Sequence, residues 1–479
     1  MRKLLYINIL FSALAFVGCT KDFEDINTNQ NAPVSVEPEF LLRQVSYDFA
    51  EEMSYEGFVA GNLLSQHFAM VDFNLFDRHS LSEPQLGGNP WPFIYTNLRD
   101  NEILLAKSQE TSVYDVYEGP ALVLKAYFAM ALTDIYGDAP YFEAFRAKEG
   151  IINPKYSSQE NIYMAEGGIL DNLRKASTFF ENYTGGNSLA GDIIFNGDLS
   201  QWAKFANSLR IKALMRISSK MDVSTELTTL VNAGNYIAEN ADNAVVDFTD
   251  GKPNNFRMAN LRDGDFNLYT LSLTSEEILN DLGDPRIATF YRTENDTSSL
   301  YRGILNGRNA SNSISLDSVS LTGTIFRENA GVLEANYLTA WETNFLIAEA
   351  IERGYVTGSA KSFYDKAVQQ AFDYWNTTMP TDYLTTGNAA YGANGANTIE
   401  QIITQKWIAQ IINGYEAWIE WRRTGFPALK TIEASLNNNL IPVRMPYPTD
   451  EEALNAFNYQ QAAANTDGNS VNAPVWWDE

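Results

Sequence analysis

The 479-residue sequence contains one cysteine, two histidines and no run of basic residues. A single cysteine cannot form an internal disulfide, and with only two histidines few ligands remain for a zinc site. The formal net charge is −26, from 34 Lys and Arg against 60 Asp and Glu. Because such a chain repels a phosphate backbone, we predict that it has no nucleic-acid partner.

The sequence also lacks the short motifs of common enzymes. It contains no G-x-S-x-G elbow, no G-x-x-x-x-G-K-[ST] or G-x-G-x-x-G phosphate loop, and no H-E-x-x-H helix. His67 and His79, with Asp72 and Asp77 between them, could be drawn as a metal cluster, but we interpret each as an ordinary surface or hydrogen-bonded histidine. We therefore predict no metal ion, no cofactor and no catalysis. A glycosidase with paired carboxylates stays open as an alternative, because sequence spacing does not report a distance across a cleft.

The N-terminus has the order of a bacterial lipoprotein signal. Arg2 and Lys3 precede an apolar stretch that is too short to span a membrane, and the stretch ends at Cys19, the only cysteine. Residues 1–18 are thus predicted to be a signal peptide, and residues 19–38 a tether whose Cys19 thiol carries lipid. An ordinary secretory signal is the alternative. Acidic residues directly after Cys19 resemble the surface-export signal of Bacteroidetes lipoproteins, which predicts a protein on the outer membrane facing the cell exterior.

Residues 39–479 are predicted to form a single, mainly α-helical domain. Apolar residues recur at steps of three and four, which predicts helices over 121–136, 157–183, 199–221, 335–354, 359–375, 398–413 and 415–424. Alanines at packing positions and a stop at Gly354 make 335–375 similar to a tetratricopeptide-type helical hairpin. Large polar loops interrupt the helices at 242–265, 295–323 and 384–397, and short strands are predicted within 244–248 and 313–326.

Aromatic side chains are plentiful, with 9 Trp, 25 Tyr and 27 Phe. Trp and Tyr rings stack on the C–H faces of sugars, but most aromatics of a helical protein belong to its core. Six tryptophans on helical patterns are assigned to the core: Trp202, Trp341, Trp375, Trp407, Trp418 and Trp421. Aromatics in or beside polar loops are candidates for ligand contact instead: Trp91, Tyr269, Tyr291, Tyr301 and Tyr391.

Several sequence blocks resemble the SusD/RagB-like outer-membrane lipoproteins of Bacteroidetes. They follow the lipoprotein signal in order along nearly the whole chain: FEDINTNQNAP (23–33), LTDIYGDAPY (132–141), KYSSQENIY (155–163), FNGD (195–198), WAKFANSLR (202–210), AEA (348–350), QKW (405–407), EWRRTGFP (420–427), IPVRMPYP (441–448) and VWWD (475–478). Gln30 stands where the family's opening motif commonly has Pro.

The resemblance implies a SusD-like fold, with a tetratricopeptide-like scaffold, large irregular loops and a few short strands. It implies a surface lipoprotein that captures a nutrient, most often a glycan, and delivers it to a SusC-like TonB-dependent transporter. Ligand contact is expected at Trp91, Tyr301, Arg78, Asn97 and Tyr391, whereas Glu420, Arg422 and Arg423 are expected to be ion-paired scaffold. A peptide ligand, a lipid-anchored glycosidase or peptidase, and a scaffold without a ligand are the alternatives.

Overall fold

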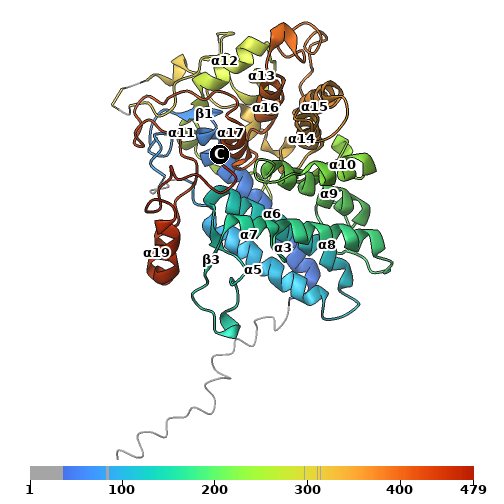
Figure 1. Ribbon diagram of the computed structural model, residues 1–479. Coiled ribbons are helices and arrows are strands. Elements are labelled where there is room, and N and C mark those ends of the chain that lie inside the picture. Colours follow the sequence, from blue (N-terminus) through green and yellow to red (C-terminus); the bar gives the residue numbers. More distant parts are fainter. Residues whose placement is uncertain (1–35, 82–85, 296, 310, 313, 479) are drawn as a thin grey trace, which may run out of the picture.

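The computed structural model describes residues 36–81, 86–295, 297–309, 311–312 and 314–478. The predicted signal peptide, Cys19 and nearly all of the predicted tether lie outside these residues. Helices dominate the described chain and the strands are short, which confirms the predicted mainly α-helical fold (Figure 1). None of the helices in these ranges combines the length and hydrophobicity that crossing a membrane requires.

The helices follow one another along the described chain, and the sequence pattern anticipates only part of them. In the N-terminal half they are α3 (Pro38–Glu56), α4 (Asn62–Leu64), α5 (Trp91–Ser108), α6 (Glu118–Tyr136), α7 (Gln159–Met164), α8 (Ile169–Asn182), α9 (Leu199–Arg216) and α10 (Ser224–Ala233). In the C-terminal half they are α11 (Asp263–Phe266), α12 (Leu273–Leu282), α13 (Ile287–Phe290), α14 (Ala340–Glu352), α15 (Ala360–Tyr374), α16 (Thr398–Ala409), α17 (Glu416–Thr424), α18 (Thr449–Leu454) and α19 (Ala456–Ala464).

The long N-terminal helices pack in succession, α3 on α5, α5 on α6, α6 on α8 and α8 on α9, and form the lower part of the molecule in Figure 1. Helix α6 is buried along most of its length and ends at Gly137, as predicted. Gly137 has φ 79°, a left-handed conformation that favours glycine. The helix predicted over 199–221 stops earlier, at Arg216.

The single helix predicted over 157–183 is wrong, because the structure has two helices there. Gly167 adopts φ 76° between α7 and α8, and such a left-handed residue cannot continue a helix. The N-cap is Ser158, whose Oγ accepts a hydrogen bond from the Asn161 amide at 3.3 Å.

The predicted helical hairpin is present as α14 and α15, which pack against each other after the turn at Gly354. Helix α14 begins at Ala340, later than predicted, because the preceding residues form strand β6 (Glu334–Leu338). This strand pairs antiparallel with β4 (Ala244–Asp247), which confirms the strand predicted over 244–248. Two more antiparallel pairs occur in the described residues: β1 (Phe68–Met70) with β5 (Tyr269–Leu271), and β2 (Ala139–Pro140) with β3 (Tyr156–Ser157).

In the region predicted to hold further strands, 313–326, the described residues contain isolated bridges only, at Leu321 and Thr322. Five of the six tryptophans assigned to the core are buried, and Trp421 is partly buried against it. Tyr269 and Tyr291, predicted beside polar loops, are 1% and 2% exposed. Their predicted availability for ligand contact is therefore wrong. Strand β5 and the end of α13 carry both rings into the core.

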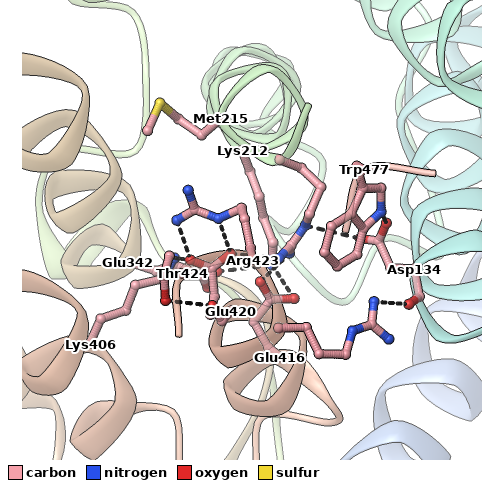
Figure 2. Close-up of polar contacts among 12 residues, drawn as sticks. Asp134, Lys212, Met215, Glu342, Lys406, Glu416, Glu420, Arg423, Thr424 and Trp477 are labelled. Atoms are coloured by element: carbon pink, nitrogen blue, oxygen red, sulfur yellow. Dashed lines mark hydrogen bonds and ion pairs between the residues drawn. The ribbon is translucent and has the colours of Figure 1, made fainter. Parts of the chain in front are cut away.

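Buried charges join five helices at the centre of the molecule (Figure 2). The residues of this network alternate in sign and are almost without exposure: Asp134 on α6, Lys212 and Arg216 on α9, Glu342 and Glu349 on α14, Lys406 on α16, and Glu416, Glu420 and Arg423 on α17. Arg423 contacts both Glu349 and Glu420 at 2.6 Å. The predicted ion-paired scaffold role of Glu420 and Arg423 is confirmed.

Candidate functional site

Three segments far apart in the chain form one surface, which we call the loop platform: residues 71–80, 304–309 and 433–440. Asp77 joins the first two segments. Its carboxylate accepts hydrogen bonds from the Gly307 amide at 2.8 Å and from Asn306 Nδ2 at 2.6 Å. The Asp77 side chain is 1% exposed, so these bonds replace the water that burial removes.

The third segment, 433–440, is tied to the other two by main-chain hydrogen bonds. The Ala434 amide donates to the Gly307 carbonyl at 2.8 Å, and the Leu436 amide donates to the Arg78 carbonyl at 2.7 Å. Arg78 Nε returns a bond to the Ala434 carbonyl at 2.8 Å. Hydrogen bonds therefore hold the three segments of the platform together, although all of them are loops.

Burial shifts the pKa values of titratable side chains beneath the platform surface. It raises the pKa of Asp77 to about 6, because a charged carboxylate loses its hydration there, and it lowers the pKa of His79 to about 4 for the same reason. Burial also lowers the pKa of His67, which stacks on Trp407 at 3.9 Å, to about 3. Of the two predicted alternatives, surface or hydrogen-bonded histidines, both residues follow the second and are buried. Within the described ranges, no three His, Cys, Asp or Glu side chains are grouped so that they could hold a metal ion.

Phe73 is the most prominent ligand-binding candidate on the loop platform. Its side chain is 64% exposed and its φ is 50°, a combination that is uncommon for a bulky residue and marks a constrained position. The neighbouring chain holds it there: Asn74 Nδ2 donates to the Arg308 carbonyl at 2.8 Å, and Arg308 Nη1 donates to the Val71 carbonyl at 3.2 Å. The result is an exposed aromatic face on a fixed base.

Exposed polar residues occur in and beside the platform segments. Asp72 and Asn309 are exposed, and Asn312 Nδ2 donates to Glu433 Oε1 at 3.2 Å at the edge of the platform. Carboxylates, amides and a flat apolar ring are the groups that bind hydroxyls and stack on sugar C–H faces. Sequence reasoning missed Phe73 because it searched for Trp and Tyr near Gly- and Asn-rich loops. The available signal was an aromatic flanked by Asp72 and Asn74, residues that tolerate left-handed turns.

Two of the predicted ligand residues are enclosed by the protein. Trp91 is the first residue of α5, is 7% exposed, and contacts the rings of Tyr95 at 4.8 Å and Tyr136 at 4.9 Å. Asn97 is 3% exposed, and its Nδ2 donates to the Phe93 carbonyl one turn earlier at 2.9 Å. Neither side chain belongs to the platform surface, and their contact with a ligand stays a prediction.

The other three predicted residues are divided between two places. Arg78 lies on the loop platform, and Tyr301, half-buried, is three residues before the segment 304–309. Only Arg78 of the predicted ligand residues therefore lies on the platform itself. Tyr391 is elsewhere: its ring is 5.2 Å from that of Tyr364 on α15, and its hydroxyl donates to Glu352 on α14.

Comparison with known proteins identifies the family. The family model SusD-like_2, described as "Starch-binding associating with outer membrane", matches residues 30–448. The match covers most of the chain, so this protein belongs to the SusD-like family, as the sequence blocks predict. No curated protein matches the chain.

Solved structures share the fold over nearly the whole chain. They include a SusD homologue of Bacteroides fragilis NCTC 9343 (TM-score 0.80, 23% identity, 93% of this chain and 100% of that chain), a chitin-binding protein (0.78, 25%, 92% and 100%) and a chitin-binding SusD homologue of Flavobacterium johnsoniae (0.76, 22%, 92% and 97%). At these identities the likeness shows a common architecture.

Proposed function

We propose that this SusD-like protein binds a glycan at the loop platform, with Phe73 stacking on a sugar ring. The observation that carries the proposal is the exposed Phe73 ring, held at φ 50° on a hydrogen-bonded base. Arg78 and the surrounding amides and carboxylates supply donors and acceptors for hydroxyl groups. Binding without turnover is what this surface supports, because its best-fixed groups position a ring and do not form a nucleophile–base pair.

A glycan is favoured over a peptide by the relatives. The family description refers to starch binding, and two of the similar solved structures are chitin-binding proteins. We further propose that the glycan passes to a SusC-like TonB-dependent transporter, and that lipid on Cys19 holds the protein on the outer membrane facing outward. The family's association with the outer membrane supports both statements.

The test is binding of starch and chitin oligosaccharides to the full chain, measured by isothermal titration calorimetry. Replacing Phe73 by Ala should weaken binding about fivefold or more, since loss of a stacked aromatic contact costs on the order of 1 kcal/mol. The matched control is Phe457→Ala, because Phe457 on α19 is also strongly exposed, at 72%.

Three results would contradict the proposal. Equal glycan affinity of the Phe73→Ala and wild-type proteins would show that the loop platform is not the glycan-binding site. Binding of peptides in place of glycans would identify a peptide-binding member of the family. Appearance of shorter oligosaccharides during incubation would show a glycosidase.

A further inference from the structure

A second large concavity lies between α12 and α16, in the upper part of the molecule in Figure 1, and we call it the α12–α16 groove. Its volume is about 920 Å³, within the range of ligand-binding sites. One wall is α12, the other is the first half of α16, and the loop 388–397 closes one side. The loop platform does not contribute to it, since the two surfaces have no lining residue in common.

The floor of the groove is rigid. It includes Tyr364 and Gln405, which are 0% and 1% exposed. The Tyr364 hydroxyl donates to the Ala389 carbonyl at 2.7 Å. The Gln405 amide donates to the Tyr383 hydroxyl and accepts from Arg286, both at 2.8 Å. A ligand would therefore meet a preformed surface, which lowers the entropic cost of binding.

The loop wall is fixed as well. Gln401 on α16 holds it from within, because its side chain accepts from the Gly392 amide at 2.8 Å and donates to the carbonyls of Asn388 and Ala390 at 3.1 Å. Asn388 Nδ2 in turn donates to the Asp281 carbonyl on the opposite wall at 3.1 Å. These bonds tie both walls together at one end and leave the groove open along its length.

The lining is rich in amides and carboxylates. Side-chain amides come from both walls and the loop: Asn280, Asn388, Asn394, Asn397, Gln401 and Gln405. Ala393 and Ala396 add small apolar surface. The amides of Gln401 and Gln405 are engaged within the protein, whereas Asn280, Asn394 and Asn397 are exposed and can bind hydroxyls as donors and acceptors. Exposed amides beside small apolar faces suit a saccharide.

The charge of the groove is one-sided. Glu276, Glu277, Asp281 and Glu400 line it, and no lysine or arginine does so in the described chain. Glu277 is paired with Lys430 at 2.6 Å, and Glu276 accepts from the Gly303 amide at 2.6 Å. By contrast, the carboxylates of Asp281 and Glu400 make no hydrogen bond or ion pair with the residues that the structure describes. They remain available to a cationic group of a ligand.

We propose that the α12–α16 groove is a second saccharide site, selective for sugars that carry a free amino group. The amides and alanines would hold the sugar rings, and Asp281 and Glu400 would bind the ammonium. The proposal is independent of the loop platform and of the glycan bound there.

The test compares two probes with the same sugar backbone, the glucosamine tetramer, which carries ammonium groups, and its fully N-acetylated form, in which neutral acetamido groups replace them; the double substitution below isolates the contribution of the charge. Both are titrated into the full-length chain carrying Phe73→Ala, so that binding at the platform is suppressed. The glucosamine tetramer should bind about tenfold more tightly, since one hydrogen bond to a charged group contributes at least that factor. Asp281→Asn combined with Glu400→Gln, which preserves side-chain shape, should abolish the preference. Glu181→Gln, at an exposed acid of α8, should leave it unchanged.

Equal affinity for the two probes, or a preference that survives the double substitution, would overturn the proposal. So would an equal loss in the Glu181→Gln control, which would indicate attraction by the net charge alone. Tighter binding of tetralysine than of the glucosamine tetramer would assign the groove to basic peptides instead. None of these results bears on glycan binding at Phe73, which is measured separately.

Discussion

Arg216 Nη1 and Glu420 Oε1 lie 2.5 Å apart, although 204 residues separate them in the chain. The two side chains are 0% and 3% exposed, so their interaction is not weakened by solvent. Lys406 and Arg423 also contact Glu420, at 2.9 and 2.6 Å. Together these contacts join α9 to α16 and α17 and connect the N-terminal helices with the C-terminal half.

Removing the Glu420 carboxylate should destabilise the protein strongly. Glu420→Ala leaves three buried cations with one partner fewer, and we expect a loss of about 3–5 kcal/mol in the free energy of unfolding. Denaturation with urea measures it. The control is Asp365→Asn, at the exposed pair with Lys361 on α15, where about 0–1 kcal/mol is expected. Equal effects of the two variants would show that the buried network adds no more than a surface pair.

Glu56 should make stability depend on pH. Burial raises its pKa to about 7 although it accepts hydrogen bonds from Tyr415 and Gly88. Between pH 4.5 and 7 the folded protein therefore retains a proton that the unfolded chain releases, so stability falls as pH rises. The contribution is up to about 3 kcal/mol. Glu56→Gln should flatten this part of the curve, measured by urea denaturation at about pH 4.5 and 8. An unchanged slope would contradict it.

Trp91→Ala should act first on stability. The ring is enclosed by Tyr95, Tyr136 and Tyr447, so its removal leaves a cavity and is expected to cost about 3–5 kcal/mol. Phe73→Ala, at an exposed ring, should stay within about 0.5 kcal/mol of wild type. Thermal denaturation measures the stability of each variant, and isothermal titration calorimetry measures its glycan binding. The two measurements together separate an effect on folding from an effect on the ligand. Unchanged stability of Trp91→Ala with weakened glycan binding would instead support the ligand contact that the family resemblance implies.

Asp77 should control the order of the loop platform. In Asp77→Asn an NH₂ group replaces one of the two oxygens, both of which accept hydrogen bonds from Met70, Asn306 or Gly307. A donor would then face a donor, at a cost of about 1–3 kcal/mol. Faster hydrogen exchange of the Gly307 amide and weaker glycan binding are expected. Asp317→Asn, at an exposed residue, is the control. If the Gly307 amide of Asp77→Asn exchanged as slowly as in the wild type, Asp77 would not hold the segments together.

Cys19→Ala should release the protein from membranes, because the predicted lipid would have no attachment site. Fractionation of cells that produce the two forms measures this. Membrane association of the variant as strong as that of the wild type would refute the lipid anchor.

The sequence by itself was sufficient for the family and for the presence of α6, α9, α14, α15, α16 and α17. Their signals are local: the 3.6-residue period of apolar side chains, and the glycine stops Gly137 and Gly354, depend on residues within about one turn. The order of the blocks along the chain identified the family without any tertiary information. The break at Gly167 was missed, since an apolar period on both sides of a glycine does not reveal its φ.

Only the tertiary structure decided which side chains are available to a ligand. Trp91 and Tyr291 look like loop aromatics in the sequence, yet Tyr136 and Tyr447 help to enclose Trp91, and the Tyr291 hydroxyl donates to the His67 carbonyl 224 residues away. Asp77, Gly307 and Ala434 meet because long-range hydrogen bonds join three loops, and the bonds of Arg308 to Asn74 and Val71 flank the exposed Phe73. Exposure is a property of the whole packed chain, whereas helix periodicity belongs to neighbouring residues. For this reason helices could be predicted from the sequence, whereas the exposure of Phe73 could not.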